Sequence, residues 1–174
     1  MARRICLGYA WPMSLKATIA LLRQHDLFAG LANARLEVIA FTAERAVFDA
    51  GDMLFEAGEE AHDAYLILSG AATMVAEAGV ADRREHAIGE GDLIGEMALL
   101  TVGPQAGLRH ADVRVISRIE ALVISRYLFQ RLMQEFPEMA GAVAGAMTRR
   151  LADTIGEMRN LAGTLGAQKD GIKR

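Results

Sequence analysis

Apolar positions follow a helical period at the start of the chain. After Ser14, apolar residues share one helical face, and Ser14 is a suitable N-cap for it (Leu15, Ile19, Leu22 and Leu27). Asn33 is a candidate cap for a second short helix that carries Leu36, Ile39 and Ala40. The first 13 residues show no such pattern, and we expect a loose leader there, with Met13 as an alternative start.

The period changes between about Glu44 and Ile124. Short apolar runs alternate with turns that contain Gly, Asp and Glu (46–48, 53–55, 65–68, 72–75, 113–116 and 121–124). Turn signals at intervals of about eight to twelve residues predict an antiparallel sandwich or barrel. The stretch from Glu77 to Glu85 is charged and small, which predicts an exposed hairpin tip.

The helical period returns near the C-terminus. Ser125 is a candidate cap for a helix to about Glu135, and Pro137 favours the start of a longer helix to about Leu165. That helix would be about 40 Å long. Its apolar seam follows a heptad spacing (Ala140, Ala144, Met147, Leu151, Thr154, Met158, Leu161 and Leu165). One small domain cannot cover such a seam, so we predict a parallel two-fold homodimer.

Four glycines interrupt this helix. Each of them lowers helix stability by up to about 1 kcal/mol relative to alanine. We expect that Gly141 and Gly145, four residues apart, permit close packing on the sheet.

Composition limits the classes of function. The chain has 174 residues, 52% of them hydrophobic, and a formal net charge of -3, which argues against a nucleic-acid partner. Its one cysteine, Cys6, cannot form an internal disulfide, and no cysteine set for a zinc or iron–sulfur site exists. We therefore expect a cytoplasmic protein without a membrane segment and without a cofactor.

The segment from Ile88 to Leu100, followed by Arg109, carries the candidate chemistry. It combines a glycine turn, a short apolar strand, the pair Gly95-Glu96 at a helix start, and an arginine. Backbone N–H groups at a helix start favour an anion, and arginine pairs with phosphate oxygens. A nearby carboxylate can accept a hydrogen bond from a ribose hydroxyl. These residue types therefore suit a sugar joined to a phosphate.

This segment resembles the phosphate-binding cassette of cyclic nucleotide-binding domains, the family that includes the catabolite activator protein and kinase regulatory subunits. Further family motifs occur in order and at about the right spacing (Gly51-Asp52, Gly58-Glu59, Ala64 to Gly70 and Gly91-Asp92). The resemblance covers roughly Leu27 to Leu161.

The fold that the resemblance implies is mainly β with helices (α+β). It is an antiparallel β-roll or jelly-roll flanked by N-terminal helices and a long C-terminal helix. We accordingly divide the chain into a leader (1–13), the β-roll with its flanking helices (14–135), the dimerisation helix (136–166) and a tail (167–174).

The resemblance also implies a set of ligand contacts. The ligand-binding residues would be the cassette turn, the phosphate-binding arginine and its neighbours (Ile94, Gly95, Glu96, Met97, Ala98, Arg109, His110 and Ala111). The Glu96 side chain would bind the ribose 2′-hydroxyl. The cassette is about three residues longer than usual, and a second alignment would put Gln105 at the phosphate. His110 stands where the family has Ser, Thr or Ala, and it would either donate to a phosphate oxygen or only be tolerated.

The C-terminal part gives an expectation about the base. Thr154 aligns with the threonine that contacts adenine in the catabolite activator protein, whereas Ile155 replaces a serine that reaches the other subunit's ligand. This favours cAMP as the ligand, with cGMP as the other option. Only about nine residues follow Leu165, too few for a helix-turn-helix. We therefore expect no DNA binding, and either a stand-alone sensor that acts through an unknown partner protein or a fragment.

Two other classes of function remain open. The first is a degenerate β-roll that binds no nucleotide and serves as a scaffold or dimerisation module. The longer cassette and His110 favour it, whereas the presence of both Glu96 and Arg109 argues against it. The second is an enzyme built on a jelly-roll. It would need paired histidines for a metal, and the four histidines are scattered (His25, His62, His86 and His110). We expect a protein that is not an enzyme.

Overall fold

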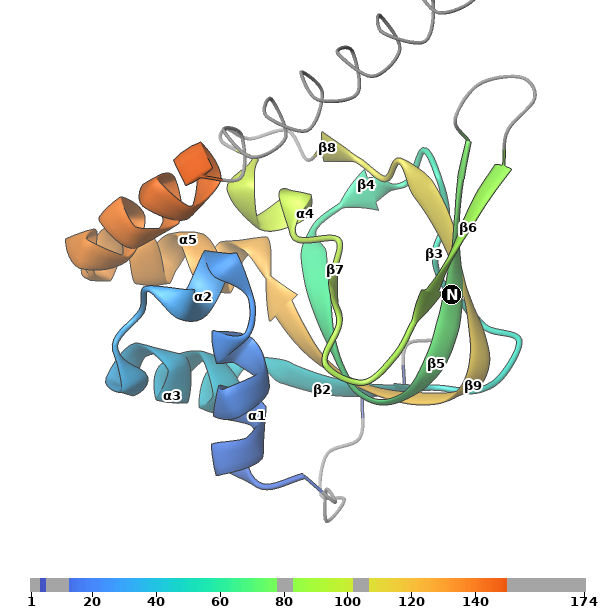
Figure 1. Cartoon of the computed structure of the whole chain (residues 1–174), viewed down its shortest axis with the longest axis horizontal. Coiled ribbons are helices and arrows are strands. Elements are labelled where there is room, and N and C mark those ends of the chain that lie inside the picture. Colours follow the sequence, from blue (N-terminus) through green and yellow to red (C-terminus); the bar gives the residue numbers. More distant parts are fainter. Residues whose placement is uncertain (1–3, 6–12, 78–82, 102–106, 150–174) are drawn as a thin grey trace, which may run out of the picture.

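The computed structural model describes residues 4–5, 13–77, 83–101 and 107–149. An antiparallel sheet curls into a roll, and most of the helices gather on one side of it (Figure 1). This confirms the predicted class, a mainly antiparallel β structure flanked by helices. Several segments with predictions lie wholly or largely outside the described residues. They are most of the proposed leader, the tip of the predicted hairpin, Gln105, Thr154 and the seam beyond Met147.

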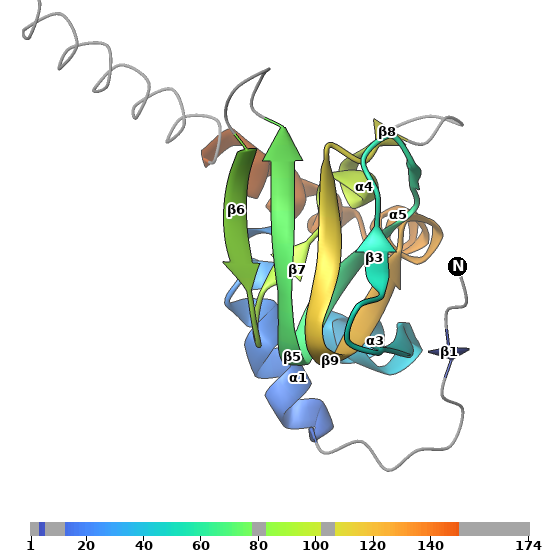
Figure 2. The same cartoon turned by 90° about the vertical axis from the view of Figure 1, so that its right-hand side faces the viewer.

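The sheet follows the order β1-β2-β9-β5-β6, with β3 paired to β9 and β7 paired to β5, and all pairs are antiparallel. Figure 2 shows β6, β5, β9 and β3 side by side. A separate pair joins β4 to β8. The strands are β1 (Arg4–Ile5), β2 (Glu44–Phe48), β3 (Met53–Phe55), β4 (Glu60–Ala61), β5 (Asp63–Glu77), β6 (Arg83–Ile88), β7 (Leu93–Ile94), β8 (Gly107–Leu108) and β9 (Ala111–Ser125).

The helices are α1 (Leu15–Arg23), α2 (Asp26–Ala29), α3 (Asn33–Thr42), α4 (Met97–Leu100), α5 (Arg126–Glu135) and a C-terminal helix described over residues 137–149. The side chain of Ser14 accepts a hydrogen bond from the Ala17 N–H, and that of Ser125 accepts one from the Leu128 N–H, so both predicted caps are confirmed. The predicted cap at Asn33 is wrong. Asn33 is the first residue of α3, and its side chain accepts from Arg23 instead.

Two predicted pairs of short strands are each one long strand. The runs 65–68 and 72–75 both belong to β5, and the runs 113–116 and 121–124 both belong to β9. Register shifts near Gly70 let β5 bend without ending. Gly70 has φ +91°, and a Cβ built on it would collide with the Arg118 carbonyl, so only glycine fits there.

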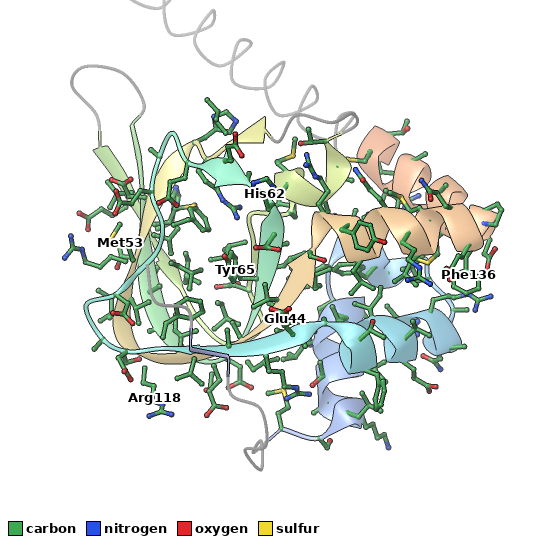
Figure 3. The ribbon with its side chains drawn as sticks, turned by 180° about the vertical axis from the view of Figure 1, so that it is seen from behind. Glu44, Met53, His62, Tyr65, Arg118 and Phe136 are labelled. Atoms are coloured by element: carbon green, nitrogen blue, oxygen red, sulfur yellow. The ribbon has the colours of Figure 1, made fainter. Side chains whose placement is uncertain are left out.

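Successive residues of β5 and β9 point into two different cores. The helix-side cluster takes Ala64, Leu66, Leu68, Leu122 and Ile124, together with buried residues of the helices. The roll cluster takes Tyr65, Ile67, Ala121 and Val123, together with Phe48, Phe55 and Ile94. Figure 3 shows Tyr65 inside the curve of the sheet. Because both faces of these strands are buried over residues 64–68 and 121–124, these two stretches read as continuous apolar runs.

The C-terminal helix packs on the other helices. Met139 and Val143 are buried in the helix-side cluster, and the Ala142 side chain faces Gly30, where a built Cβ would lie 3.4 Å from the Ala142 Cβ. The expectation that Gly141 and Gly145 pack on the sheet is wrong. A Cβ on Gly141 would meet nothing within 4 Å, and one on Gly145 would only approach Arg149 of the same helix.

Two further findings concern the N-terminal residues and the length of the helices. Arg4 and Ile5 pair with Val47 and Ala46 of β2, so two residues of the predicted loose leader lie in the sheet. None of the helices in the described ranges has the length and apolar character needed to cross a membrane.

Candidate functional site

The turn that leads into the cassette is fixed to the middle of β5. The Asp92 carboxylate accepts a hydrogen bond from the Gly89 N–H at 2.8 Å, and Gly91 has φ +90°. Two backbone hydrogen bonds then join the turn to Ile67. The Gly91 N–H donates to the Ile67 carbonyl at 2.8 Å, and the Ile67 N–H donates to the Asp92 carbonyl at 2.9 Å. These bonds fix the turn, and with it the start of β7, against β5.

The cassette itself is a strand, a glycine turn and a short helix. Ile94 is buried in the roll cluster, and Gly95 follows it with φ +71°. The Ala98 N–H donates to the Gly95 carbonyl at 3.0 Å and so closes the first turn of α4. Ala98 is buried, whereas Met97 is 58% exposed. The Glu96 side chain is half-buried.

Arg109 is fixed through its backbone, from outside the cassette. Its N–H donates to the Glu59 carbonyl at 2.8 Å, and its carbonyl accepts from the Gly58 N–H at 2.9 Å. Both partners directly precede β4, so the loop between β3 and β4 fixes the position of the Arg109 backbone. His110, the next residue, is exposed, and Ala111 is buried at the start of β9.

The Arg109 side chain turns inward. It is only 7% exposed, and its Nη2 donates to the Asp63 carbonyl at 2.8 Å. The guanidinium carbon lies 4.2 Å from the centre of the Phe55 ring and 5.7 Å from that of Tyr65. A buried guanidinium keeps its positive charge, so this position carries a fixed cation at low solvent access.

Arg109 also touches the cassette. A Cβ built on Gly95 would collide with Arg109 Nη1 and would lie 3.3 Å from the Asp63 carbonyl. The structure therefore brings Gly95 and Arg109 together, although they are 14 positions apart, whereas the Glu96 side chain lines a cavity beside the N-terminal helices. The aromatic residues Phe55 and Tyr65 belong to the same cluster and were not predicted as site residues.

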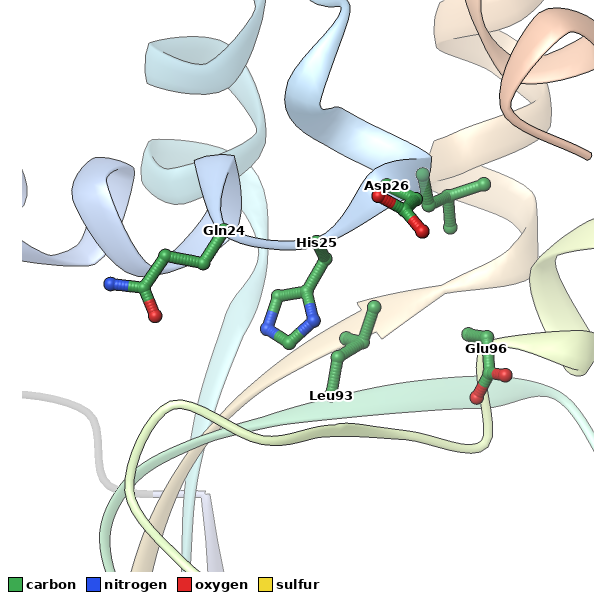
Figure 4. Close-up of a pocket in the computed structure, with 6 residues that line it drawn as sticks. Gln24, His25, Asp26, Leu93 and Glu96 are labelled. Atoms are coloured by element: carbon green, nitrogen blue, oxygen red, sulfur yellow. The ribbon is translucent and has the colours of Figure 1, made fainter. Parts of the chain in front are cut away.

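A small cavity lies between the cassette and the N-terminal helices. It has a volume of about 220 Å³ and is lined by Gln24, His25, Asp26, Leu27, Leu93 and Glu96. Figure 4 shows Gln24 at one end and Glu96 at the other, with the His25 ring between them. His25 Nε2 lies 2.6 Å from the Gly91 carbonyl. Because a carbonyl only accepts, Nε2 carries the proton and donates. This contact ties the end of α1 to the turn before the cassette.

A second polar contact holds the junction between α5 and the C-terminal helix. The Arg35 guanidinium lies 3.5 Å from the centre of the Phe136 ring and 3.0 Å from a carboxylate oxygen of Glu138. The Glu138 carboxylate accepts from its own backbone N–H at the helix start, and this, together with Arg35, lowers the pKa of Glu138 below its usual value. Figure 3 shows Phe136 at the outer end of the helical side.

The described ranges contain no group of three or more His, Cys, Asp or Glu residues that could hold a metal ion.

Comparisons with known proteins agree on one family. A family model described as the cyclic nucleotide-binding domain matches residues 45–136. The chain is 28% identical over 133 residues to a cyclic AMP receptor protein of Thermus thermophilus, covering 76% of this chain and 60% of that protein. It is 30% identical over 139 residues to lysophospholipase NTE1 of Pyricularia oryzae, covering 78% of this chain. The chain spans 9% of the length of that lysophospholipase.

Solved structures share the fold. The N-terminal domain of a transcriptional regulator from Streptomyces coelicolor A3(2) superposes with a TM-score of 0.68 at 24% identity, covering 77% of this chain and 94% of that domain. The catabolite activator protein of Thermus thermophilus superposes with a TM-score of 0.64 at 27% identity, covering 79% of this chain and 63% of that protein.

Proposed function

The chain belongs to the cyclic nucleotide-binding domain family, and from this premise we propose that it is a cAMP sensor that acts through a partner protein. The family supports a regulatory nucleotide-binding module over residues 45–136. The choice of cAMP, the docking of the ligand and the partner are our proposal. The similarity to a protein named cyclic AMP receptor protein supports the choice of nucleotide.

The observation that carries the proposal is the buried cation beside the cassette. Arg109 is 7% exposed and lies against Gly95, at a turn where a larger residue would collide with it. A desolvated guanidinium next to a glycine turn suits a phosphate monoanion, because planar N–H donors match phosphate oxygens in pairs. Burying a guanidinium costs free energy, and a bound phosphate would offset part of that cost.

In the proposed complex, the cyclic phosphate lies on the backbone of the cassette turn and on Arg109. Glu96 accepts a hydrogen bond from the ribose 2′-hydroxyl. The neighbouring positions shape the walls of the site (Ile94, Met97, Ala98, His110 and Ala111). The exposed Met97 side chain, at the start of α4, is well placed to contact the sugar or the base.

The proposed mechanism ends at the C-terminal helix. We propose that the adenine meets this helix near Thr154, and that the liganded state favours a closer position of the helix. Ligand binding would then shift the population between two helix positions and so change the surface offered to a partner. Of the three seam positions in the described part of the helix, Ala140 and Ala144 are exposed, whereas Met147 packs against the helix-side cluster.

Isothermal titration with cAMP and with cGMP tests the proposal. We expect micromolar or tighter binding of cAMP, weaker binding of cGMP, and loss of binding in Arg109→Ala. Truncating one partner of a buried, hydrogen-bonded charge pair costs about 2–5 kcal/mol. The matched control is Arg118→Ala, which removes an exposed arginine from the middle of β9 and should leave the affinity unchanged.

Each other outcome has a definite meaning. Binding that survives Arg109→Ala would move the phosphate anchor elsewhere, with Gln105 as the next candidate. Equal affinity for cAMP and cGMP would refute the role of Thr154. Folded protein that takes up neither nucleotide would refute the sensor and leave a nucleotide-free scaffold.

A further inference from the structure

Three aromatic rings form a row inside the roll, and Arg109 lies at its end. Phe48 and Tyr65 meet edge to face with ring centres 6.1 Å apart, and Tyr65 and Phe55 lie 6.0 Å apart with a tilt of 32°. All three side chains are at most 8% exposed. Arg109 is closest to Phe55, with the guanidinium carbon 4.2 Å from the ring centre.

The guanidinium lies in a slot with three different sides. The Phe55 ring forms one side, the Asp63 carbonyl receives Nη2 at 2.8 Å, and the Gly95 turn covers Nη1. These groups come from β3, β5 and the cassette. The three contacts leave the planar group little freedom to rotate or to withdraw.

We propose that Phe55 is a positioning residue for ligand binding: its ring holds the Arg109 guanidinium flat and at the correct depth for the cyclic phosphate. This inference rests on the proposed function of Arg109 as the phosphate anchor. Phe55 itself touches no phosphate oxygen in this scheme, and it acts only through Arg109.

The physical reason lies in the state of the cation before the ligand arrives. A guanidinium that has lost most of its water is stabilised by the negative face of an aromatic ring, and this attraction grows as water is excluded. The face of an aromatic ring attracts a cation less strongly than a carboxylate does, so it competes less with a phosphate for the guanidinium. The aromatic face therefore keeps Arg109 buried, oriented and attractive to an anion.

A purely structural role for Phe55 makes a different prediction. As a core residue alone, Phe55 could be replaced by another large apolar side chain with a loss of stability and no loss of affinity. Phe48 provides the matched comparison, because it is a buried phenylalanine of the same row whose ring contacts Tyr65.

The experiment is titration of the full chain with cAMP, together with thermal unfolding of each variant. We expect Phe55→Leu to weaken cAMP binding about tenfold, which corresponds to about 1.4 kcal/mol, within the range for a desolvated cation–π contact. Phe55→Tyr keeps the aromatic face and should restore affinity to within about twofold. Phe48→Leu should lower the unfolding temperature without weakening binding.

Other outcomes overturn the inference. If the wild type binds and Phe55→Leu binds equally well, or if Phe48→Leu weakens binding as much as Phe55→Leu, Phe55 does not position Arg109. If Phe55→Leu does not fold, Phe55→Met takes its place, since methionine fills irregular apolar space without an aromatic face. If the wild type itself binds neither cAMP nor cGMP, the proposed function has failed, and the inference fails with it.

Discussion

Replacement of Gly95 by alanine combines backbone strain with a steric collision, and a matched glycine elsewhere in the chain separates the two effects. Gly95 has φ +71°, a region that costs an alanine about 1–2 kcal/mol relative to glycine. The reduced entropy of the unfolded chain returns about 0.4–1 kcal/mol. The backbone effect alone should therefore destabilise the fold by about 1 kcal/mol, equivalent to about 2–4 °C in a chain of this size.

The collision adds an effect on the ligand site. The new Cβ would overlap Arg109 Nη1 and lie 3.3 Å from the Asp63 carbonyl. The far end of a long side chain can move more easily than a backbone carbonyl, so Arg109 should be the group that shifts. We expect the affinity for cAMP to fall at least about 30-fold, the lower end of the cost of disturbing a buried charge pair.

Gly51→Ala is the matched control for this substitution. Gly51 has φ +93°, its N–H donates to the Val115 carbonyl away from Arg109, and a Cβ built on it would meet nothing within 4 Å. It therefore carries the same backbone strain without any collision. We expect both variants to lose similar stability in urea unfolding and only Gly95→Ala to lose affinity in calorimetric titration. Equal cAMP affinity in the two variants would refute the contact between Gly95 and Arg109 as a determinant of binding.

Three other predictions concern stability. Gly70→Ala should destabilise the protein by at least about 3 kcal/mol in urea unfolding, because strain at φ +91° adds to a collision with the Arg118 carbonyl, which cannot move aside; a loss of 1 kcal/mol or less would contradict this. Ser125→Ala removes the N-cap of α5 and should lower the free energy of unfolding by about 1 kcal/mol, measured the same way. The pKa of Glu138 is lower in the folded protein than its value of about 4.5 in the unfolded chain, so the ionised carboxylate stabilises the fold at pH values above 4.5. This contribution is lost as the pH falls through the pKa of the folded state. The advantage in stability of wild type over Glu138→Gln should therefore be largest at pH 7 and should shrink as the pH is lowered below 4.5; a constant difference in melting temperature would exclude the linkage.

The features that the sequence predicted are those with local causes. The caps at Ser14 and Ser125 depend on a hydrogen bond three residues ahead, so the spacing alone identifies them. The glycine turn, the short strand and the start of α4 follow one another directly in the cassette. The apolar runs 64–68 of β5 and 121–124 of β9 are visible because both faces of the strands are buried over these residues.

The features that the sequence did not predict depend on distant partners. Asn33 has the right chemistry for a cap, but Arg23 of the neighbouring helix takes its side chain. Phe55 lies 54 positions before Arg109, and nothing in its surrounding sequence separates it from other phenylalanines of the core. His25 looks like a residue at the end of a helix, and only the fold brings the Gly91 carbonyl to it.

The helix-side cluster has a consequence for where this protein can be cut. The family match begins at residue 45 and ends at residue 136. Among the described residues, more than half of the buried members of that cluster lie outside this range, including Phe28, Ile39 and Met139. A shortened protein with those limits would expose the apolar face formed by Leu66, Leu122 and Phe129 to water, and such a face promotes aggregation. The smallest piece that folds should therefore begin before α1 and extend through at least residue 146, and ligand-binding assays on anything shorter would report on a damaged core.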